Sequence, residues 1–126
     1  MTTQDPYSIT FSSHPAGLKA SVRGPGTLEN TLAYWRAIEA ELRRRPAPAL
    51  LLVDEMRGAA LSEEQWRQVV ETMKGGPLGQ FRVAHVKPNG LQTIEYCELF
   101  AVEAGICARV FTHEAEAVRW LRHGLR

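Results

Sequence analysis

The stretch that decides the fold is residues 49–58, Ala-Leu-Leu-Leu-Val-Asp-Glu-Met-Arg-Gly. It opens with five apolar residues, becomes acidic at Asp54 and Glu55, and stops at Gly58. A short apolar run bounded by turn residues is typical of a strand buried on both faces, as in a parallel sheet covered by helices. Because ligands and partners meet such sheets at the carboxyl ends of the strands, functional residues are expected within 54–62.

Two alternating strands come before this stretch. Residues 7–13 and 18–23 alternate apolar and polar side chains, which is the pattern of a strand with one face in water. The turn at 14–17 contains Pro and Gly and is short, so it joins the two strands as an antiparallel hairpin. The strand at 50–53 is apolar throughout, and we therefore expect the hairpin toward an edge of the sheet.

Four helices are predicted from apolar residues that recur at intervals of three and four. Thr27 and Ser62 are typical N-terminal caps of the first two helices, and Ser62 forms a capping box with Gln65. The third helix is expected to follow a cap at Asn89, and the fourth a cap at Thr112. The residues expected to face inward are Leu28, Leu32, Trp35, Ile38 and Leu42, then Trp66, Val69, Val70 and Met73, then Leu91, Ile94, Cys97, Leu99 and Val102, and finally Ala115, Val118 and Leu121.

With further strands at 81–86 and 106–111, the order of elements is β-β-α-β-α-β-α-β-α. Strands that alternate with helices imply right-handed crossovers and a mainly parallel sheet. The fold class predicted is therefore α/β, with a mixed five-stranded sheet that is antiparallel only at the N-terminal hairpin. We expect residues 1–126 to form one domain, with an ordered core from about residue 6 to about residue 123.

The composition excludes some classes of protein. Fifteen basic and fourteen acidic side chains leave a net charge of +1, so we do not expect a nucleic-acid-binding protein. No apolar run approaches the roughly 20 residues of a membrane span, and the N-terminus lacks the features of a secretory signal. A cytoplasmic protein of bacterial type is therefore expected, in which Cys97 and Cys107 are reduced thiols packed in the core.

Motifs that would bind a cofactor or a metal are missing from the sequence. The glycines at 75–79 lack the Lys-Ser/Thr ending of a phosphate-binding loop, and Gly24-Pro25-Gly26 lacks the third glycine of a dinucleotide fingerprint. The four histidines are not spaced as metal ligands with each other or with the cysteines. We therefore predict no cofactor, no metal and no catalytic residue.

An enzymatic interpretation would depend on the convergence of Asp54, His85 and Cys97. His85 lies inside a predicted strand and is expected to be a hydrogen-bonded core histidine, while nothing in the sequence places a base beside Cys97. Asp54 and Glu55 should point to opposite faces of their strand, so they are not a pair of catalytic carboxylates. We expect Asp54 to support the following loop, through loop amides or through Arg57, and we predict a protein without enzymatic activity.

Ser62 has two interpretations. As a helix cap it needs only a hydroxyl that accepts an amide proton. As a phosphoacceptor it would place phosphate at a helix N-terminus, where free amides and the helix dipole stabilise it, although neighbouring glutamates oppose the charge. The cap is favoured, and Ser62 stays a candidate phosphoacceptor. The candidates for binding a partner are Asp54, Glu55, Arg57, Ser62 and Glu63.

The C-terminal half contains four characteristic segments, namely residues 81–86 (Phe-Arg-Val-Ala-His-Val), 100–105 (Phe-Ala-Val-Glu-Ala-Gly), 109–111 (Arg-Val-Phe) and 116–121 (Glu-Ala-Val-Arg-Trp-Leu). Together with the order of elements, they resemble the SpoIIAA-like group of STAS domains. It implies a mixed sheet that is parallel except at one edge, with helices largely on one side. It also implies a small non-enzymatic regulator that is switched by phosphorylation of a serine between the third strand and the second helix. Ser62 falls near that place, without the Asp-Ser-Ser-Gly pattern of the family.

Two functions follow from these observations. The first is a regulatory or protein-interaction module that presents the loop 54–62 and the start of the second helix to a protein partner. The alternative is a carrier of a lipid or other small apolar ligand, because the SpoIIAA-like branch is similar to the lipid-binding Sec14 fold. Self-association as a homodimer also remains open. Tyr34, Tyr96 and Trp120 lie off or at the margin of the apolar stripes and are candidates for solvent-facing contacts, although Trp120 is better explained as core.

Overall fold

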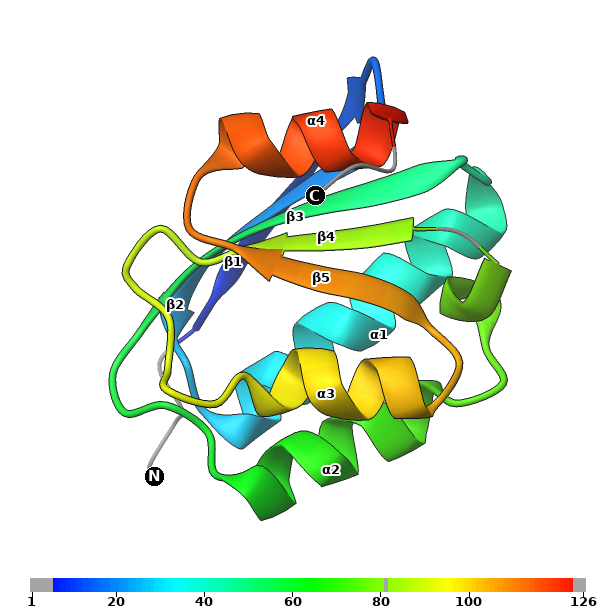
Figure 1. Cartoon of the computed structure of the whole chain (residues 1–126). Helices are drawn as coiled ribbons and strands as arrows, with labels where there is room; N and C mark the ends of the chain where they lie inside the picture. The colour runs from blue at the N-terminus through cyan, green and yellow to red at the C-terminus, as the bar shows by residue number, and fades with distance from the viewer. Residues whose placement is uncertain (1–5, 81, 124–126) are drawn as a thin grey trace.

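The computed structural model describes residues 6–80 and 82–123 and has the predicted α/β fold (Figure 1). The predicted strand at 81–86 includes Phe81, which lies outside the described residues. The elements in chain order are β1 (Ser8–His14), β2 (Gly17–Pro25), α1 (Leu28–Arg44), β3 (Ala49–Arg57), α2 (Glu63–Met73), a 3-10 turn η1 (Pro77–Gln80), β4 (Arg82–Val86), α3 (Tyr96–Glu103), β5 (Cys107–Phe111) and α4 (Glu114–His123).

The five strands form one mixed sheet in the order β1-β2-β3-β4-β5. β1 and β2 are an antiparallel hairpin at one edge, and the other three neighbouring pairs are parallel. Both features were predicted. β3 lies at the centre, so the strand that is apolar throughout has a neighbour on each side.

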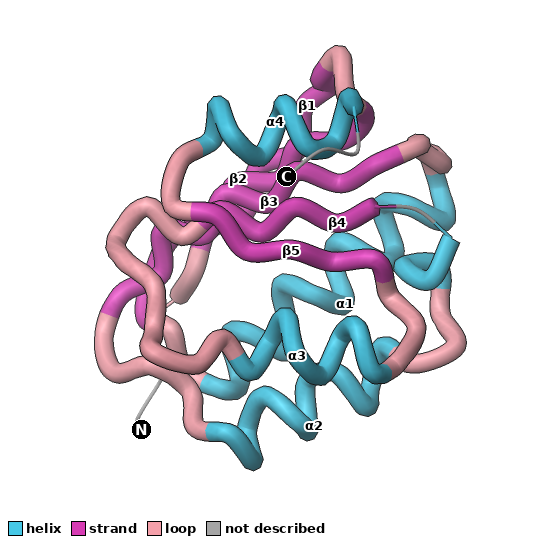
Figure 2. Tube along the Cα trace, viewed as in Figure 1, coloured by secondary structure: helices cyan, strands magenta, loops and turns pink. Residues whose placement is uncertain are grey.

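Helices cover both faces of the sheet, but unequally. α1, α2 and α3 lie on one face and α4 lies alone on the other (Figures 1 and 2). The side chains of β3 explain this arrangement, since Leu50 and Leu52 join the larger core under the three helices while Leu51 and Val53 join the smaller core under α4. A strand whose alternate residues enter two cores must be apolar at every position, and this accounts for the run at 49–53.

β3 is longer than the apolar run. Asp54 and Glu55 are paired with Val22 and Arg23 of β2, so they belong to the strand as expected, and β3 ends only at Arg57. Gly58 then adopts a φ of +104°, a conformation that glycine reaches at little cost, and turns the chain away from the sheet. The segment expected to carry function therefore starts as the end of a strand, and only residues 58–62 form a loop.

The third helix differs from its prediction. α3 begins at Tyr96 and not after Asn89, and it buries Cys97 together with Phe100 and Ala101. The four other residues expected inside are 46–56% exposed, namely Leu91, Ile94, Leu99 and Val102. The cause is the loop at 87–95, in which the Asn89 side chain donates to the Met56 carbonyl and the Gln92 amide donates to the Glu95 carboxylate. This loop moves the start of the helix by almost two turns.

The last helix was placed correctly but with the wrong inner face. Leu121 is buried as predicted, whereas Ala115 is exposed and Val118 is only half-buried. Ala117 and Trp120 take the inner positions instead. Trp120 is therefore a core residue, as favoured, and its indole contacts Phe111.

The caps predicted at Thr27 and Ser62 are confirmed, whereas the one at Asn89 is wrong because α3 begins at Tyr96. The Thr27 hydroxyl accepts the amide proton of Asn30 at the start of α1. At the start of α2 the Ser62 hydroxyl accepts the amide proton of Gln65, and the Gln65 side chain accepts that of Ser62. Within the described residues, no helix has the length and apolar character needed to cross a membrane.

The outer edge of the sheet at β5 has an additional contact. The Glu98 carboxylate of α3 accepts the backbone amide proton of Val110 at 2.7 Å. Cys107, at the start of this edge strand, is exposed, so the expectation that both cysteines are core residues is wrong for Cys107 and right for Cys97.

Candidate ligand-binding site

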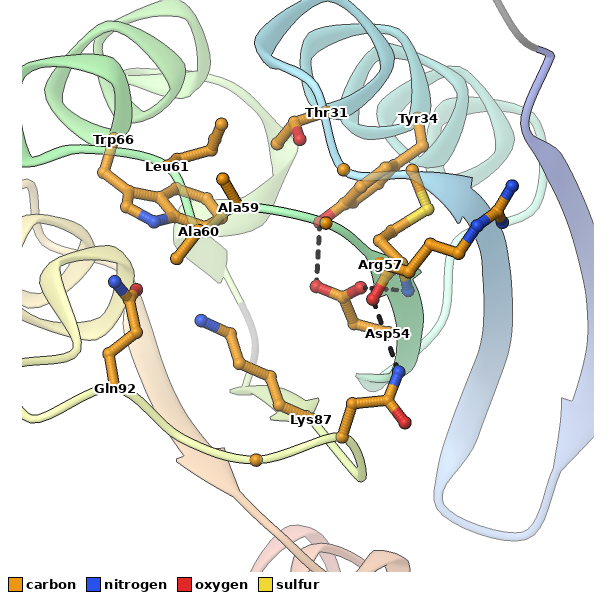
Figure 3. A pocket seen from close by; sticks show the side chains of 15 residues that line it. Thr31, Tyr34, Asp54, Arg57, Ala59, Ala60, Leu61, Trp66, Lys87 and Gln92 are labelled. Carbon is orange, nitrogen blue, oxygen red and sulfur yellow. Dashed lines mark hydrogen bonds between the residues drawn. The ribbon is translucent and has the colours of Figure 1, made fainter.

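A pocket of about 330 Å³ opens at the carboxyl ends of the central strands (Figure 3). Its walls come from the ends of β3 and β4, from the loop at 58–61, from the loop at 89–92 and from the first turns of α1 and α2. The lining residues with polar side chains are Thr31, Tyr34, Asp54, Arg57, Trp66, Lys87, Asn89 and Gln92. The pocket therefore lies at the place where ligands of parallel sheets are expected, and these polar side chains share its walls with a larger apolar surface.

Asp54 and His85 meet beneath this pocket because of the strand register. Leu52 of β3 is paired with His85 of β4, and Asp54 lies two residues farther along β3, on the same face of the sheet. The Asp54 Oδ2 atom is 2.8 Å from His85 Nε2, and the Asp54 Oδ1 atom accepts the amide proton of Met56 at 3.0 Å. Asp54 thus supports the strand end, as expected, but its side-chain partner is His85 and not Arg57.

The Asp54 carboxylate is stabilised in its ionised form. Burial by itself would raise its pKa, but the hydrogen bond and charge interaction with His85, the amide of Met56 and the charge of Lys87 outweigh burial. The pKa of Asp54 is therefore held below its ordinary value of 3.8. At neutral pH the pocket has a fixed acceptor with a full negative charge.

Aromatic rings enclose the pair on the core side. His85 is 4% exposed, and Trp35 and Trp66 lie edge-on to its ring, with centroids 6.0 and 6.3 Å away. Tyr34 was a candidate for a solvent-facing contact, but it is 1% exposed and donates a long hydrogen bond of 3.4 Å to Asp54 Oδ2. Burial and the neighbouring charge of Asp54 raise the pKa of Tyr34 well above its ordinary value, so its hydroxyl keeps its proton.

A second polar group is centred on Lys87. Its ammonium donates to Glu95 Oε1 at 2.6 Å and lies 5.1 Å from the centroid of the Trp66 ring. Burial would lower the pKa of Lys87, but interactions with Cys97, Glu95 and Asp54 raise it. Lys87 is therefore a cation, and it forms one wall of the pocket.

Cys97 does not have the environment of a nucleophile. Its thiol donates to Glu95 Oε1 at 3.4 Å, and burial followed by the charge of Glu95 raises its pKa to about 12. A thiol that stays protonated at neutral pH is a poor nucleophile. Asp54 and His85 converge as the enzymatic interpretation requires, but Cys97 contacts Glu95 and does not line the pocket.

The other predicted site residues lie around the rim. Arg57 is exposed and lines the mouth of the pocket, whereas Glu55 points to the opposite face of the sheet and pairs with Arg23 at 2.8 Å. Ser62 and Glu63 are exposed just beyond the pocket, at the start of α2. Capping is the observed role of the Ser62 hydroxyl, and phosphorylation of Ser62 stays a prediction.

Lys87 and Gln92 line the pocket but were not singled out from the sequence, and neither was Glu95, which pairs with Lys87. All three follow the fourth strand. A signal was present in the sequence His85-Val86-Lys87, because alternate residues at the end of a buried strand share one face. Two polar residues on that face, next to the end of the apolar strand that contains Asp54, indicate a polar site at the strand ends.

The described residues include no cluster of His, Cys, Asp and Glu side chains that could hold a metal ion. The cavity between the helices and the sheet, next to Trp35 and Val70, is about 30 Å³. In this conformation that cavity is too small for an acyl chain. What the strand-end pocket offers is a set of charged and neutral hydrogen-bonding groups for a small ligand.

No family model, no curated protein and no solved structure matches this chain. The resemblance to SpoIIAA-like STAS domains consequently stays a prediction.

Proposed function

We propose that the protein is a non-enzymatic regulatory module that binds a small polar ligand in the strand-end pocket and presents residues 54–62, with the start of α2, to a protein partner. The observation that carries the proposal is the position of Ala59 and Ala60. Both residues line the pocket and both are exposed. A ligand in the pocket would therefore contact the same short loop that a partner would meet from outside.

The loop is well placed to respond to a ligand. It is fixed at one end by β3 and at the other by the capping box of Ser62, and between them only Leu61 is buried. A segment of four residues with few buried contacts opens at a low free-energy cost compared with the core. A ligand that contacts one conformation of the loop better than another would shift its population.

The chemistry of the site also favours binding over catalysis. The Cys97 thiol and the Tyr34 hydroxyl are held in their protonated, weakly nucleophilic forms, and the His85 Nε2 atom is already bound to Asp54. The SpoIIAA-like resemblance supports the same proposal. For the ligand, the charged groups of Asp54 and Lys87 in the pocket and the small volume of the core cavity favour a polar molecule over the apolar one considered from the sequence.

Native mass spectrometry with a pocket-filling variant tests the proposal. Ala60→Trp places an indole in the pocket from an exposed loop position, and Ala115→Trp adds the same side chain at an exposed position of α4, on the other face of the sheet. After exposure to a metabolite extract, the wild-type protein and Ala115→Trp should carry a small non-covalent adduct that Ala60→Trp lacks. An adduct that persists in Ala60→Trp, or no adduct in any protein, contradicts ligand binding in this pocket.

The partner-binding part is tested at Ser62, once an interacting protein is in hand. Ser62→Ala removes the cap alone, whereas Ser62→Asp adds a negative charge at the helix start beside Glu63 and Glu64. If this surface is the interface, Ser62→Asp should weaken the complex while Ser62→Ala leaves it nearly unchanged. Equal binding by both variants and the wild type would place the interface elsewhere.

A further inference from the structure

The hydrogen-bonding groups of the pocket are separated into two ends. At one end, Asp54 presents its carboxylate beside the Tyr34 hydroxyl. At the other, Lys87, Gln92 and the indole nitrogen of Trp66 gather on the facing side (Figure 3). One end is therefore an acceptor with a negative charge, and the other is a group of donors that includes a positive charge.

The acceptor end has unused capacity. An ionised carboxylate has about four lone-pair positions, and Asp54 uses one on Oδ1, for Met56, and two on Oδ2, for His85 and Tyr34. One further donor can therefore bind to Oδ1. A charged donor is favoured there, since hydrogen bonds between two ionised groups are roughly twice as strong as neutral ones.

The donor end has an unsatisfied group. Trp66 is 5% exposed, and its Nε1–H, which can only donate, has no hydrogen-bond partner among the described residues. A buried donor without an acceptor costs about 1–3 kcal/mol, so a ligand acceptor at this position removes a cost that the empty pocket carries. Lys87 lies over the same indole ring and commits one of its three N–H groups to Glu95.

The balance of fixed charges limits the charge of the ligand. The Asp54 carboxylate and the Lys87 ammonium face the pocket, and Lys87 is already paired with Glu95. The Arg57 side chain points away from them (Figure 3), so the pocket has no excess of positive charge. A ligand with several negative charges, such as a phosphate ester, would place them near Asp54 and Glu95 without compensation.

From these observations, and on the basis of the proposed function, we infer that the pocket takes a small zwitterion of the α-amino-acid class. The ligand carboxylate would bind at Lys87 and the Trp66 Nε1–H, and the ligand ammonium would bind at Asp54. A zwitterion meets both ends while adding no net charge. The pocket volume of about 330 Å³ corresponds to roughly ten water molecules, which leaves room for a side chain beside the two charged groups.

The experiment is isothermal titration of the purified protein with each standard L-amino acid singly. The amino acid that binds most tightly is then compared with two matched analogues, namely its α-carboxamide, which lacks the carboxylate, and the same acid without its ammonium group. Each analogue should bind at least about tenfold more weakly, which is 1.4 kcal/mol per analogue. An analogue that binds as tightly as the amino acid overturns the assignment of the end that it lacks.

Variants then assign the two ends separately. Lys87→Met should weaken binding of the amino acid at least tenfold but leave binding of the carboxamide nearly unchanged. Asp54→Asn should likewise weaken binding of the amino acid at least tenfold but leave binding of the analogue without ammonium nearly unchanged. Lys74→Met is the matched control, because Lys74 is exposed at the end of α2 and pairs only with Glu71 in the described structure. Circular dichroism checks that each variant is folded. Ala60→Trp, which leaves both charged groups intact, should abolish binding in any case.

The outcomes separate this inference from the function on which it rests. If no amino acid binds, but an extract gives a non-covalent adduct that Ala60→Trp removes, the ligand class is wrong and the binding module stands. The ligand class is also overturned if inorganic phosphate binds more tightly than any amino acid and this binding is lost in Ala60→Trp. If no probe and no extract gives binding that depends on Ala60, both the ligand class and the proposed ligand-binding function are wrong.

Discussion

Replacing Asp54 with asparagine preserves the shape of the side chain and removes its charge. The carboxylate accepts protons from the Met56 amide at 3.0 Å, from His85 Nε2 at 2.8 Å and from the Tyr34 hydroxyl at 3.4 Å. Asparagine has one acceptor oxygen, so its amide nitrogen must face at least one of these donors. A hydrogen bond to a charged group contributes about 1.5–3 kcal/mol, and an unpaired buried donor costs about 1–3 kcal/mol.

From these values, Asp54→Asn should lower the free energy of unfolding by about 2–4 kcal/mol at neutral pH. The measurement is urea denaturation followed by tryptophan fluorescence, because Trp35 and Trp66 pack against His85. Glu55→Gln is the matched control. This substitution neutralises the next residue in the strand. Because the ion pair of Glu55 with Arg23 lies near the surface on the opposite face, its loss should change the free energy of unfolding by less than about 1 kcal/mol.

The pH dependence gives the same prediction a second test. Since the pKa of Asp54 is lower in the folded state than its ordinary value of 3.8, ionised Asp54 stabilises the fold above that pH. This contribution is lost as the pH falls through the folded-state pKa. The difference between wild type and Asp54→Asn should therefore shrink as the pH falls below about pH 4. A variant within about 0.5 kcal/mol of the wild type at neutral pH, or a difference that does not change with pH, would refute the reasoning.

Three further predictions test the cap, the cysteines and the inner face of α3. Ser62→Ala should cost about 1 kcal/mol in urea denaturation, with Ser62→Thr close to wild type, and a loss below about 0.3 kcal/mol would contradict the cap. A thiol reagent should label exposed Cys107 and spare Cys97, whose pKa is about 12, as peptide mapping would show; equal labelling would contradict this difference. Leu99→Asp should change stability by less than about 0.5 kcal/mol, whereas Phe100→Asp should cost more than about 3 kcal/mol, and the reverse order would mean that α3 is turned the other way.

The central strand and the hairpin were predictable because their patterns report burial directly. An apolar run at 49–53 requires cover on both faces, and the alternation in the hairpin requires cover on one. α3 was misplaced for an equally physical reason. Leu91, Ile94, Leu99 and Val102 have helical spacing, but the bonds of Glu95 to Lys87 and to the Gln92 amide hold the preceding segment as a loop. Neither bond is visible in the spacing of apolar residues that predicted the helix.

The pocket was predictable in position but not in composition. Strand ends of a parallel sheet are expected to bind ligands, and residues 54–62 were singled out on that ground. The partner of Asp54 depends on the register of β3 against β4, which pairs Leu52 with His85. A shift of one residue would turn the Asp54 or the His85 side chain to the opposite face. Register is set by the packing of the two cores, so no local pattern in the sequence specifies it.

The contact between Glu98 and the Val110 amide has a consequence for assembly. An edge strand with free amides can pair with a strand of another chain, and proteins protect such edges with charges or covering elements. Here α3 supplies a carboxylate that already occupies one outward amide of β5, and that carboxylate would be displaced before a second chain could add a strand there. Pairing of a second chain with β5 is therefore disfavoured relative to an edge whose amides are all free.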